Sequence, residues 1–278
     1  MLAASLQPRS LPRTQNRDEW KANFSFAGSS WVGHGGSGSV FAIDDDRVIK
    51  VFSQDEEGQM DLEREWMIYD KLQSGGYSSR NVIKFYEQWA SGLVLERLSC
   101  TLRQHLAKLP QCTRASSAPQ WIRECCEGLV YLHQNGVLHS DLGCQNILLG
   151  KDNHAKLCDF AGSKVGDDEA WISYEARSQH PDYLGSQPTQ ETELFALGSV
   201  IFEIWTCRPP YVSEADSSVY QKFLKRDFPL SSIEDQAIQE IVSKCWNGVY
   251  NSVTEVCDEL DSEALDSLGS EQVLSNEV

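Results

Sequence analysis

The segment from Val137 to Gly162 constrains the chain most, because it brings His139, Asp141, Asn146 and Asp159 into one short stretch. Two brief apolar runs, ILL and AKLC, separate the polar side chains, with the turn-forming sequence GKDN between them. Short apolar runs bounded by turn residues predict a strand, a turn and a second strand. This hairpin would place Asn146 beside Asp159, and their hard oxygen atoms are ligands that suit Mg²⁺.

Composition limits what kind of protein the chain can form. At 278 residues, of which 41% are hydrophobic, it is long enough for one large domain or two smaller lobes. The longest apolar run, residues 194–205, contains Glu203 and is too short to cross a membrane, so it predicts a buried helix. The nine cysteines include no CxxC pair, which predicts free thiols in a reducing intracellular compartment, cytoplasmic or nuclear.

The formal net charge of −17 argues against nucleic acid and anionic membranes as main partners, because both would repel the chain. Residues 1–27 are polar, and their first 17 positions carry three arginines and no acid, a faint likeness to a mitochondrial presequence. Two prolines interrupt any amphipathic helix there, which favours a disordered tail. Residues 263–278 are acidic and serine-containing, so we expect a second disordered tail after a folded region at 28–262.

The first part of that region, residues 28–98, has the pattern of a small β-rich lobe. We expect five strands, which fall near residues 30–43 on either side of a glycine-rich turn and at 47–52, 82–89 and 93–98. One helix at 59–73 interrupts them, and the spacing of Leu62, Trp66 and Leu72 predicts its buried face.

The second part, residues 99–262, is mainly helical in pattern. Periodic apolar residues predict helices at 101–108, 119–134, 192–206, 215–225, 233–246 and 252–261. The helix at 192–206 is apolar on nearly all sides. That composition predicts that it passes through the centre of its lobe.

The glycine-rich turn reads GHGGSGSV from Gly33 to Val40 and fits the pattern G-x-G-x-x-G-x-V. Because it lies between two strands, it favours a phosphate-covering hairpin over a dinucleotide-binding turn, which would open a helix. Lys50 follows one strand later and is a candidate phosphate ligand. Glu65, at the edge of the buried helix face, can hold that lysine, whereas Glu63 points elsewhere.

These motifs occur in the order and spacing of the eukaryotic protein kinases, which the chain resembles over about residues 28–260. The sequences HSDLGCQNILL and KLCDFAGS are similar to those of divergent kinase-like proteins of filamentous fungi. The resemblance implies a bilobal α+β fold. Its N-lobe, residues 28–98, would hold a five-stranded antiparallel sheet with one helix, and its C-lobe, residues 99–262, would be mostly helical.

The resemblance also implies a role for each motif residue. Asp141 would accept the proton of a substrate hydroxyl or orient it, Asn146 and Asp159 would hold Mg²⁺, and Lys50 locked by Glu65 would position the phosphates of ATP. Leu95 would be the gatekeeper before an adenine-binding hinge. The implied ATP-binding residues are Gly33, His34, Gly35, Gly36, Ser37, Gly38, Val40, Val48, Lys50, Leu95, Glu96, Leu98 and Leu148.

The catalytic segment departs from the family pattern at several positions. Ser140 replaces the arginine that grips a phosphorylated activation loop, which predicts a kinase of the non-RD type without a phospho-switch in that loop. Gly143 replaces the lysine of serine/threonine kinases, and removing one such stabiliser typically costs about 10²–10³ in rate. Lys164 and Arg177 are candidate substitutes for that cation.

Other departures concern the C-lobe and the cysteines. Ala161 follows Phe160 where the family has glycine, the sequence His180-Pro181-Asp182 takes the place of the APE element, and no arginine partner for Asp182 is evident near residues 246–254. Glu193 occupies the position of the acid that usually opens the large C-lobe helix in the family. We expect Cys158 at the back of the nucleotide site and Cys144 in a more exposed position.

Three functions remain open at this point. The first is an ATP- and Mg²⁺-dependent protein kinase, expected as a monomer that acts on Ser or Thr hydroxyls, with ATP and a protein substrate as partners. The second is a pseudokinase that binds nucleotide or acts as a scaffold, a reading based on the four departures at 140, 143, 161 and 193. The third is a small-molecule kinase of the aminoglycoside or choline type. The protein kinase is favoured because the chain keeps all five polar motif residues, Lys50, Glu65, Asp141, Asn146 and Asp159.

Overall fold

The computed structural model describes residues 21, 25, 29–74, 78–109, 116–172, 174–183, 185 and 187–262. The tail expected at 263–278 lies outside the described residues, as does the tail expected at 1–27 apart from residues 21 and 25. Among the described residues, none of the helices combines the length and the apolar character needed to cross a bilayer.

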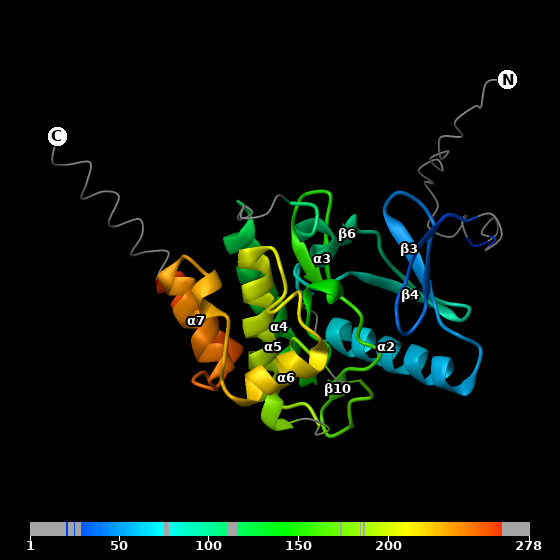
Figure 1. Ribbon diagram of the computed structural model, residues 1–278. Helices are drawn as coiled ribbons and strands as arrows, with labels where there is room; N and C mark the ends of the chain where they lie inside the picture. Colours follow the sequence, from blue (N-terminus) through cyan, green and yellow to red (C-terminus); the bar gives the residue numbers. More distant parts are fainter. Residues whose placement is uncertain are drawn as a thin grey trace, which may run out of the picture.

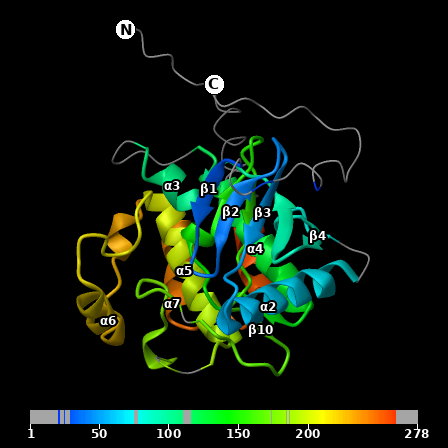
Figure 2. The same cartoon turned by 90° about the vertical axis from the view of Figure 1, so that its right-hand side faces the viewer.

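The chain folds into two lobes, which confirms the expected bilobal α+β class (Figure 1). One lobe is a five-stranded antiparallel sheet in the order β1-β2-β3-β5-β4. Its strands are β1 (Trp31–His34), β2 (Ser39–Ala42), β3 (Arg47–Val51), β4 (Phe85–Trp89) and β5 (Gly92–Glu96). Helix α2 (Glu56–Ser74) lies along one side of this sheet, as both views show (Figures 1 and 2).

The buried face of α2 differs from the expected one at one position. Leu62 and Leu72 are buried, but Trp66 is 40% exposed, so the prediction for Trp66 was wrong. Glu65 is fully buried in its place, beside Ile68. Hydrophobicity alone favoured the tryptophan, whereas the helix turns a carboxylate inward because Lys50 provides it with a charged partner.

The other lobe is mainly helical, as expected. Its helices are α3 (Leu102–Leu106), α4 (Ala118–Gln134), α5 (Gln190–Thr206), α6 (Asp216–Leu224) and α7 (Gln236–Trp246), followed by a helical stretch at 253–262. Short 3₁₀ turns lie at Cys144–Asn146, Pro181–Tyr183 and Leu230–Ser232. The bounds differ from the expected ranges by a few residues at most.

Helix α5 runs through the centre of this lobe, and all its residues from Thr192 to Trp205 are buried. Thr189 caps its first turn, so that the acid at position 193 is held at a fixed point of the helix. Helix α7 packs closely against α5 at Gly198, where an added Cβ would lie 2.8 Å from the Cβ of Cys245. A larger residue at 198 would therefore push these two helices apart.

The motif segment lies between the lobes as short strands and loops. The predicted hairpin is present: β8 (Ile147–Leu149) pairs with β9 (Ala155–Leu157), and β8 also pairs with β6 (Cys100–Thr101). A second small pair joins β7 (Val137–Leu138) to β10 (Lys164–Val165). These two-residue strands carry too few residues for a periodic signal, which is why the sequence did not predict them.

Candidate active site

The motif residues of the two lobes meet at Lys50. Its ammonium group donates hydrogen bonds to Glu65 at 2.6 Å and to Asp159 at 2.6 Å. Strand β3 supplies the lysine, helix α2 supplies Glu65, and the segment after β9 supplies Asp159. One buried cation therefore holds the helix of the N-lobe and the predicted metal ligand of the C-lobe in a single geometry.

The charges of this cluster are shifted by burial and by one another. Burial would lower the pKa of Lys50, but the carboxylates of Asp159 and Glu65 outweigh it and raise that pKa above its usual value. Burial raises the pKa of Glu65, against the opposing effect of Lys50. For Asp159 burial again acts upward, but Lys50 and a hydrogen bond from Ser37 hold its pKa below the usual value. Lys50 and Asp159 are accordingly both charged at neutral pH.

The glycine-rich turn lies over Asp159. Gly35 donates its N–H to the carbonyl of Gly38 at 2.9 Å, and the hydroxyl of Ser37 donates to Asp159 Oδ1 at 3.1 Å. At Gly38 a Cβ would lie 2.5 Å from the carbonyl oxygen of Val51, so only glycine fits between β2 and β3 there. The turn thus approaches the predicted metal ligand through a side chain as well as through backbone.

Two oxygen atoms face this region without a protein partner among the described residues. The carboxamide nitrogen of Asn146 donates to the carbonyl and to Oδ2 of Asp141, both at 2.8 Å, which leaves its Oδ1 available. Asp159 uses Oδ1 for Lys50 and Ser37, which leaves Oδ2 available. An amide oxygen and a carboxylate oxygen are the ligand types that Mg²⁺ binds, so this donor set fits the predicted ion.

Asp141 has a raised proton affinity. Its pKa is raised to about 6, chiefly because it is buried, and the nearby carboxylates of Asp159 and Glu175 act in the same direction. His139 and the hydrogen bond from Asn146 oppose the shift. A carboxylate with this pKa is ionised at neutral pH yet basic enough to accept a proton from a bound hydroxyl.

Glu193 holds the backbone of the catalytic segment in place. Its buried carboxylate accepts hydrogen bonds from the backbone N–H groups of His139 at 2.6 Å and Ser140 at 3.0 Å. It also accepts from the hydroxyl of Tyr174 at 2.9 Å and lies 3.1 Å from Nε2 of His133. Although burial acts to raise its pKa, these bonds hold that pKa below the usual value. The departure at this position therefore keeps a working carboxylate.

His139 and Phe160 support the segment from below. The two rings meet edge to face with their centroids 5.4 Å apart, and Nε2 of His139 lies 3.1 Å from the carbonyl oxygen of Cys158. Phe160 also meets Tyr69 of α2 edge to face at 5.4 Å. Aromatic contacts thus run from the catalytic loop to the helix that carries Glu65.

The apolar residues predicted to bind adenine belong to, or pack against, the apolar cluster that extends through both lobes. Val48 belongs to the main apolar cluster, and Val40, Leu98 and Leu148 pack against it. Leu95 is buried in the same cluster. In the part of the chain that the structure describes, the backbone N–H of Leu98 donates no hydrogen bond.

Glu96 differs from these apolar neighbours in having a charged partner. Both oxygens of its carboxylate accept a hydrogen bond from the ammonium group of Lys156, each at 2.8 Å. The backbone N–H of Glu96 donates to the carbonyl of Lys84 at 2.9 Å. This ion pair joins β5 of the N-lobe to β9 of the C-lobe. The segment between the lobes is thereby fixed at one point by charge.

The two candidate substitute cations are engaged elsewhere. Lys164 donates to the carbonyl of Pro188 at 3.3 Å. Arg177 donates to Asp216 at 2.7 Å and to the carbonyl of Glu214 at 2.6 Å, which fixes it to the first residue of α6 and to the segment just before that helix. A Cβ at position 143 would lie 2.3 Å from Oε1 of Gln145, so a longer side chain there would require the flexible end of Gln145 to move aside.

The sequence did not predict three contacts of the activation segment. Asp182 does have an arginine partner, but this is Arg226 after α6 and not a residue near 246–254. The guanidinium of Arg64 lies 4.0 Å from the centroid of the Trp171 ring and donates to the carbonyl of Ser163 at 3.3 Å. These contacts depend on how distant segments fold back, for which the sequence holds no local signal.

The cysteine predictions had different outcomes. Cys158 lies next to Asp159 and its thiol donates to the carbonyl of Asn146 at 3.3 Å. Cys144 is completely buried, so the prediction of a more exposed position was wrong. Its side chain points toward α5, where it lies 4.0 Å from the carbonyl of Val200, because the 3₁₀ turn directs it away from the site.

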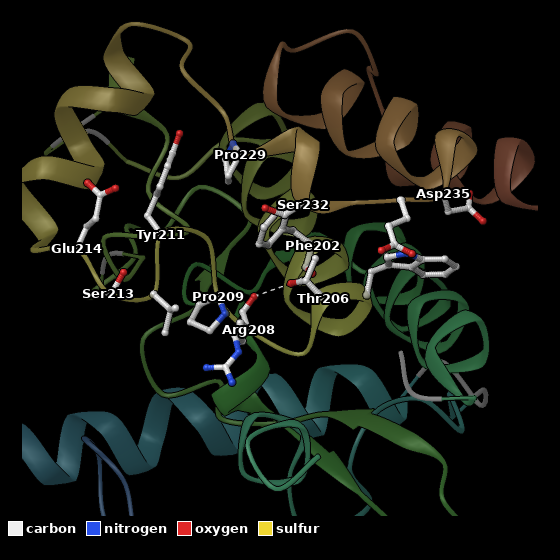
Figure 3. A pocket seen from close by; sticks show the side chains of 13 residues that line it. Phe202, Thr206, Arg208, Pro209, Tyr211, Ser213, Glu214, Pro229, Ser232 and Asp235 are labelled. Atoms are coloured by element: carbon white, nitrogen blue, oxygen red, sulfur yellow. Dashed lines mark hydrogen bonds between the residues drawn. The ribbon is translucent and has the colours of Figure 1, made fainter. Parts of the chain in front are cut away.

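The larger of two described cavities lies away from these residues. It measures about 820 Å³ and is bordered by the end of α5 and the segment that leads to α6, with Thr206, Arg208 and Tyr211 among its lining (Figure 3). A cavity of about 490 Å³ borders the glycine-rich turn at Ser37 and the first part of α2 at Asp61. Only the second of these adjoins the motif residues.

Comparisons with known proteins identify a family for the chain. The model of the protein kinase domain family matches residues 26–268. Serine/threonine-protein kinase RUNKEL of Arabidopsis thaliana is 30% identical over 200 residues, which cover 66% of this chain and 14% of that protein. Mitogen-activated protein kinase kinase kinase 7 of Drosophila melanogaster is 26% identical over 240 residues, covering 78% of this chain and 34% of that protein.

A human protein shows a shorter but more similar match. The cAMP-dependent protein kinase catalytic subunit PRKX of Homo sapiens is 36% identical over 107 residues, which cover 36% of this chain and 29% of that protein. In all three cases the matched part is about a third or less of the relative's own length.

Proposed function

Because the chain belongs to the protein kinase family, we propose that it transfers the γ-phosphate of ATP to a Ser or Thr hydroxyl of a protein. The observation that carries the proposal is the pair of 2.6 Å contacts from Lys50 to Glu65 and to Asp159. A cation held between two lobes in this way is positioned to bind phosphate oxygens. The similarity to a serine/threonine-protein kinase supports Ser or Thr as the acceptor class.

Each part of the site has a defined task in this proposal. Lys50 binds the α- and β-phosphates, and the N–H groups of the turn from Gly33 to Gly38 cover the triphosphate. The free N–H of Leu98 donates to the adenine ring, which the apolar side chains around Val48 enclose. Asp141 orients the acceptor hydroxyl and takes its proton as the new bond to phosphorus forms.

Asn146 and Asp159 would hold Mg²⁺ through their available oxygens. When bound, this ion neutralises the charge that develops on the transferred phosphate. Asn146 has a second task, because its amide also fixes the carboxylate of Asp141 at 2.8 Å. Ser37 must release Asp159 before the phosphates can enter beneath the glycine-rich turn.

The activation segment is held without a phosphate in this proposal, as the non-RD sequence predicts. Ser140 accepts a hydrogen bond from the backbone N–H of Lys164 at 3.2 Å, where an arginine side chain would otherwise reach a phosphorylated residue. The Arg64–Trp171 contact ties the segment to α2. Both contacts form in the unmodified chain.

We expect Trp171→Ala to lower phosphate transfer by roughly 2- to 5-fold, because a cation–π contact to an exposed ring contributes about 0.5–1 kcal/mol. Trp171→Phe, which keeps an aromatic face, should retain most of the activity. The measurement is the initial rate with a peptide substrate, before and after treatment of the enzyme with a phosphatase. A rate that collapses on phosphatase treatment would contradict the absence of a phospho-switch.

One observation favours a second function, that of a nucleotide-binding pseudokinase. Position 143 carries no cation, and the side chains of Lys164 and Arg177 bind Pro188 and the start of α6, respectively. A site that lacks this stabiliser can still bind Mg·ATP through Lys50 and Asp159. Binding and transfer must therefore be measured separately.

Two measurements on the full chain test the proposal. Thermal stabilisation by ATP that requires Mg²⁺ reports nucleotide binding. Phosphate transfer to a mixed library of Ser, Thr and Tyr peptides, with Asp141→Asn as the control, reports catalysis. Stabilisation without transfer would identify a pseudokinase, and transfer to aminoglycosides or choline but not to peptides would identify a small-molecule kinase.

The pH dependence of transfer follows from Asp141. Since its pKa is about 6, the rate should fall about tenfold per pH unit below that value as the carboxylate becomes protonated. Glu175→Gln should move this acidic limb to lower pH, because it removes a nearby negative charge that raises the pKa. The check is a profile of kcat from pH 5 to 8, and a limb that Glu175→Gln leaves unmoved would contradict the assignment.

A further inference from the structure

The carboxamide of Gln145 fills the space that a side chain at position 143 would take. A Cβ added at Gly143 would lie 2.3 Å from Oε1, 2.6 Å from Nε2 and 2.8 Å from Cδ of Gln145. The backbone does not require glycine there, because Gly143 has φ −172° and ψ 163°, an extended conformation that any residue adopts. Gln145 therefore stands where the side chain of residue 143 would otherwise be.

This carboxamide belongs to the short loop that carries Asp141. The backbone N–H of Asn146 donates to the carbonyl of Gly143 at 2.9 Å, and the carboxamide of Asn146 donates to Asp141 Oδ2 at 2.8 Å. Leu142, between them, is completely buried. Because successive side chains of an extended segment point to opposite sides, the space at position 143 lies on the same side as the Asp141 carboxylate.

The two polar atoms of the Gln145 side chain differ in their surroundings. Oε1 is buried and has no hydrogen-bond partner among the described residues. Nε2 is likewise without a partner in that part of the chain, yet it stays accessible to solvent, so both of its N–H groups are free to donate. Burying an amide oxygen without a partner is unfavourable, and native proteins tolerate it where a site requires the group. The side chain is thus held for a donor role that the free protein does not use.

We infer that Gln145 is a further catalytic residue, whose Nε2 donates a hydrogen bond to the γ-phosphate of ATP from the space that a lysine at position 143 would occupy. The inference rests on the proposed function and identifies the donor that its catalytic loop otherwise lacks. Lys164 and Arg177 are bound elsewhere and do not supply it. A neutral N–H group that is fixed beside the transferred group stabilises the charge that develops there.

The donor itself is unchanged by the reaction. As the acceptor oxygen forms its bond to the γ-phosphorus, the bond from that phosphorus to the β,γ-bridging oxygen breaks, and ADP leaves with the electron pair. The hydroxyl proton passes to Asp141, while the amide protons of Gln145 remain on nitrogen. Because Nε2 acts only on the oxygens of the transferred group, its removal should affect that group and not the bound ADP.

Nucleotide affinities measured by calorimetry on the full chain test this contact without requiring turnover. Gln145→Ala should weaken the binding of Mg·ADP with aluminium fluoride, a mimic of the phosphoryl group in transfer, by roughly 10- to 100-fold, as expected for a hydrogen bond to a charged group. Binding of Mg·ADP alone should stay unchanged. Gln221→Ala, at an exposed position of α6, is the matched control and should behave as the wild type.

The outcomes separate this inference from the proposed function. Equal losses for both ligands in Gln145→Ala, or no loss for either, would overturn the role of Gln145, whether or not the wild-type chain transfers phosphate. A wild-type chain that binds neither ligand would reject the proposed function and this inference with it. Gln145→Glu keeps the shape but lacks the N–H groups, so wild-type affinity for the aluminium fluoride complex in this variant would also contradict the contact.

Rescue from position 143 gives a second test, because the two side chains share one space. In Gly143→Lys/Gln145→Ala the lysine can enter the space that the carboxamide leaves, so the affinity for the aluminium fluoride complex should recover. In a wild-type chain that transfers phosphate, Gln145→Ala should lower kcat by about 10²–10³-fold with little change in the KM for ATP, and the double variant should restore kcat. A double variant no better than Gln145→Ala would show that the space at position 143 does not face the γ-phosphate.

Discussion

Glu193→Ala should lower the free energy of unfolding by about 3–5 kcal/mol and reduce the rate of phosphate transfer by more than 100-fold. The buried carboxylate is the shared acceptor for the N–H groups of His139 and Ser140 and for the hydroxyl of Tyr174. Its removal leaves these donors buried without a partner, and the backbone before Asp141 loses its support. Thermal unfolding and transfer rates measure the two effects.

Two further variants define the cause. Gln190→Ala changes an exposed residue of the same helical turn and should leave stability and rate unchanged. Glu193→Gln keeps the shape but cannot ionise. A wild-type rate in Glu193→Ala would show that the catalytic loop does not depend on this carboxylate.

The contribution of Glu193 to stability has a defined pH dependence. Because its pKa is lower in the folded state than its ordinary value of 4.5, the ionised form is stabilised by folding. The stability difference between the wild type and Glu193→Gln should be complete above about pH 4.5. It should be lost as the pH falls through the folded-state pKa.

The bilobal fold was predictable because its long elements carry strong periodic signals. The helix now called α5 is apolar on all sides, and the hairpin of β8 and β9 is bounded by turn residues, so both were recognised from sequence. The prediction that Trp66 is buried was wrong because hydrophobic periodicity assigns large apolar residues to the buried face. The buried position belongs to Glu65, whose burial depends on Lys50 from a different strand.

The site was predictable as a set of residues but not as a set of contacts. In the sequence, Glu193 is a departure that favours the pseudokinase alternative. In the structure it has four polar partners around the catalytic loop. The partner of Asp182 was sought in the wrong segment, because Arg226 reaches it only through the fold of α6. Local patterns fix the type of residue, whereas such partnerships follow from tertiary packing.

Lys50→Met should abolish measurable transfer and also destabilise the protein without nucleotide. The single cation serves two carboxylates, of which Glu65 is fully buried. Breaking a buried ion pair by removing one partner costs about 3–5 kcal/mol. The loss should be partly offset at low pH, since Glu65 already has a raised pKa and can take up a proton.

The sign of this pH effect distinguishes a charge effect from a packing effect. A carboxyl group whose folded-state pKa is raised contributes less stability as the pH rises through that pKa, so Lys50→Met should be least stable at high pH. A loss that is constant with pH would indicate lost packing of the lysine side chain instead. Lys71→Met, at an exposed position on α2, is the matched control for loss of one positive charge.

The double variant Lys50→Met/Glu65→Gln separates stability from catalysis. It removes the fully buried carboxylate of Glu65 together with the cation, so much of the lost stability should return, and the pH dependence that Glu65 causes should disappear while that of Asp159 remains. Transfer should stay absent, because no cation remains to bind the phosphates beside Asp159. Recovery of transfer in the double variant would show that Lys50 only neutralises Glu65, and the phosphate-binding role of this lysine would have to be abandoned.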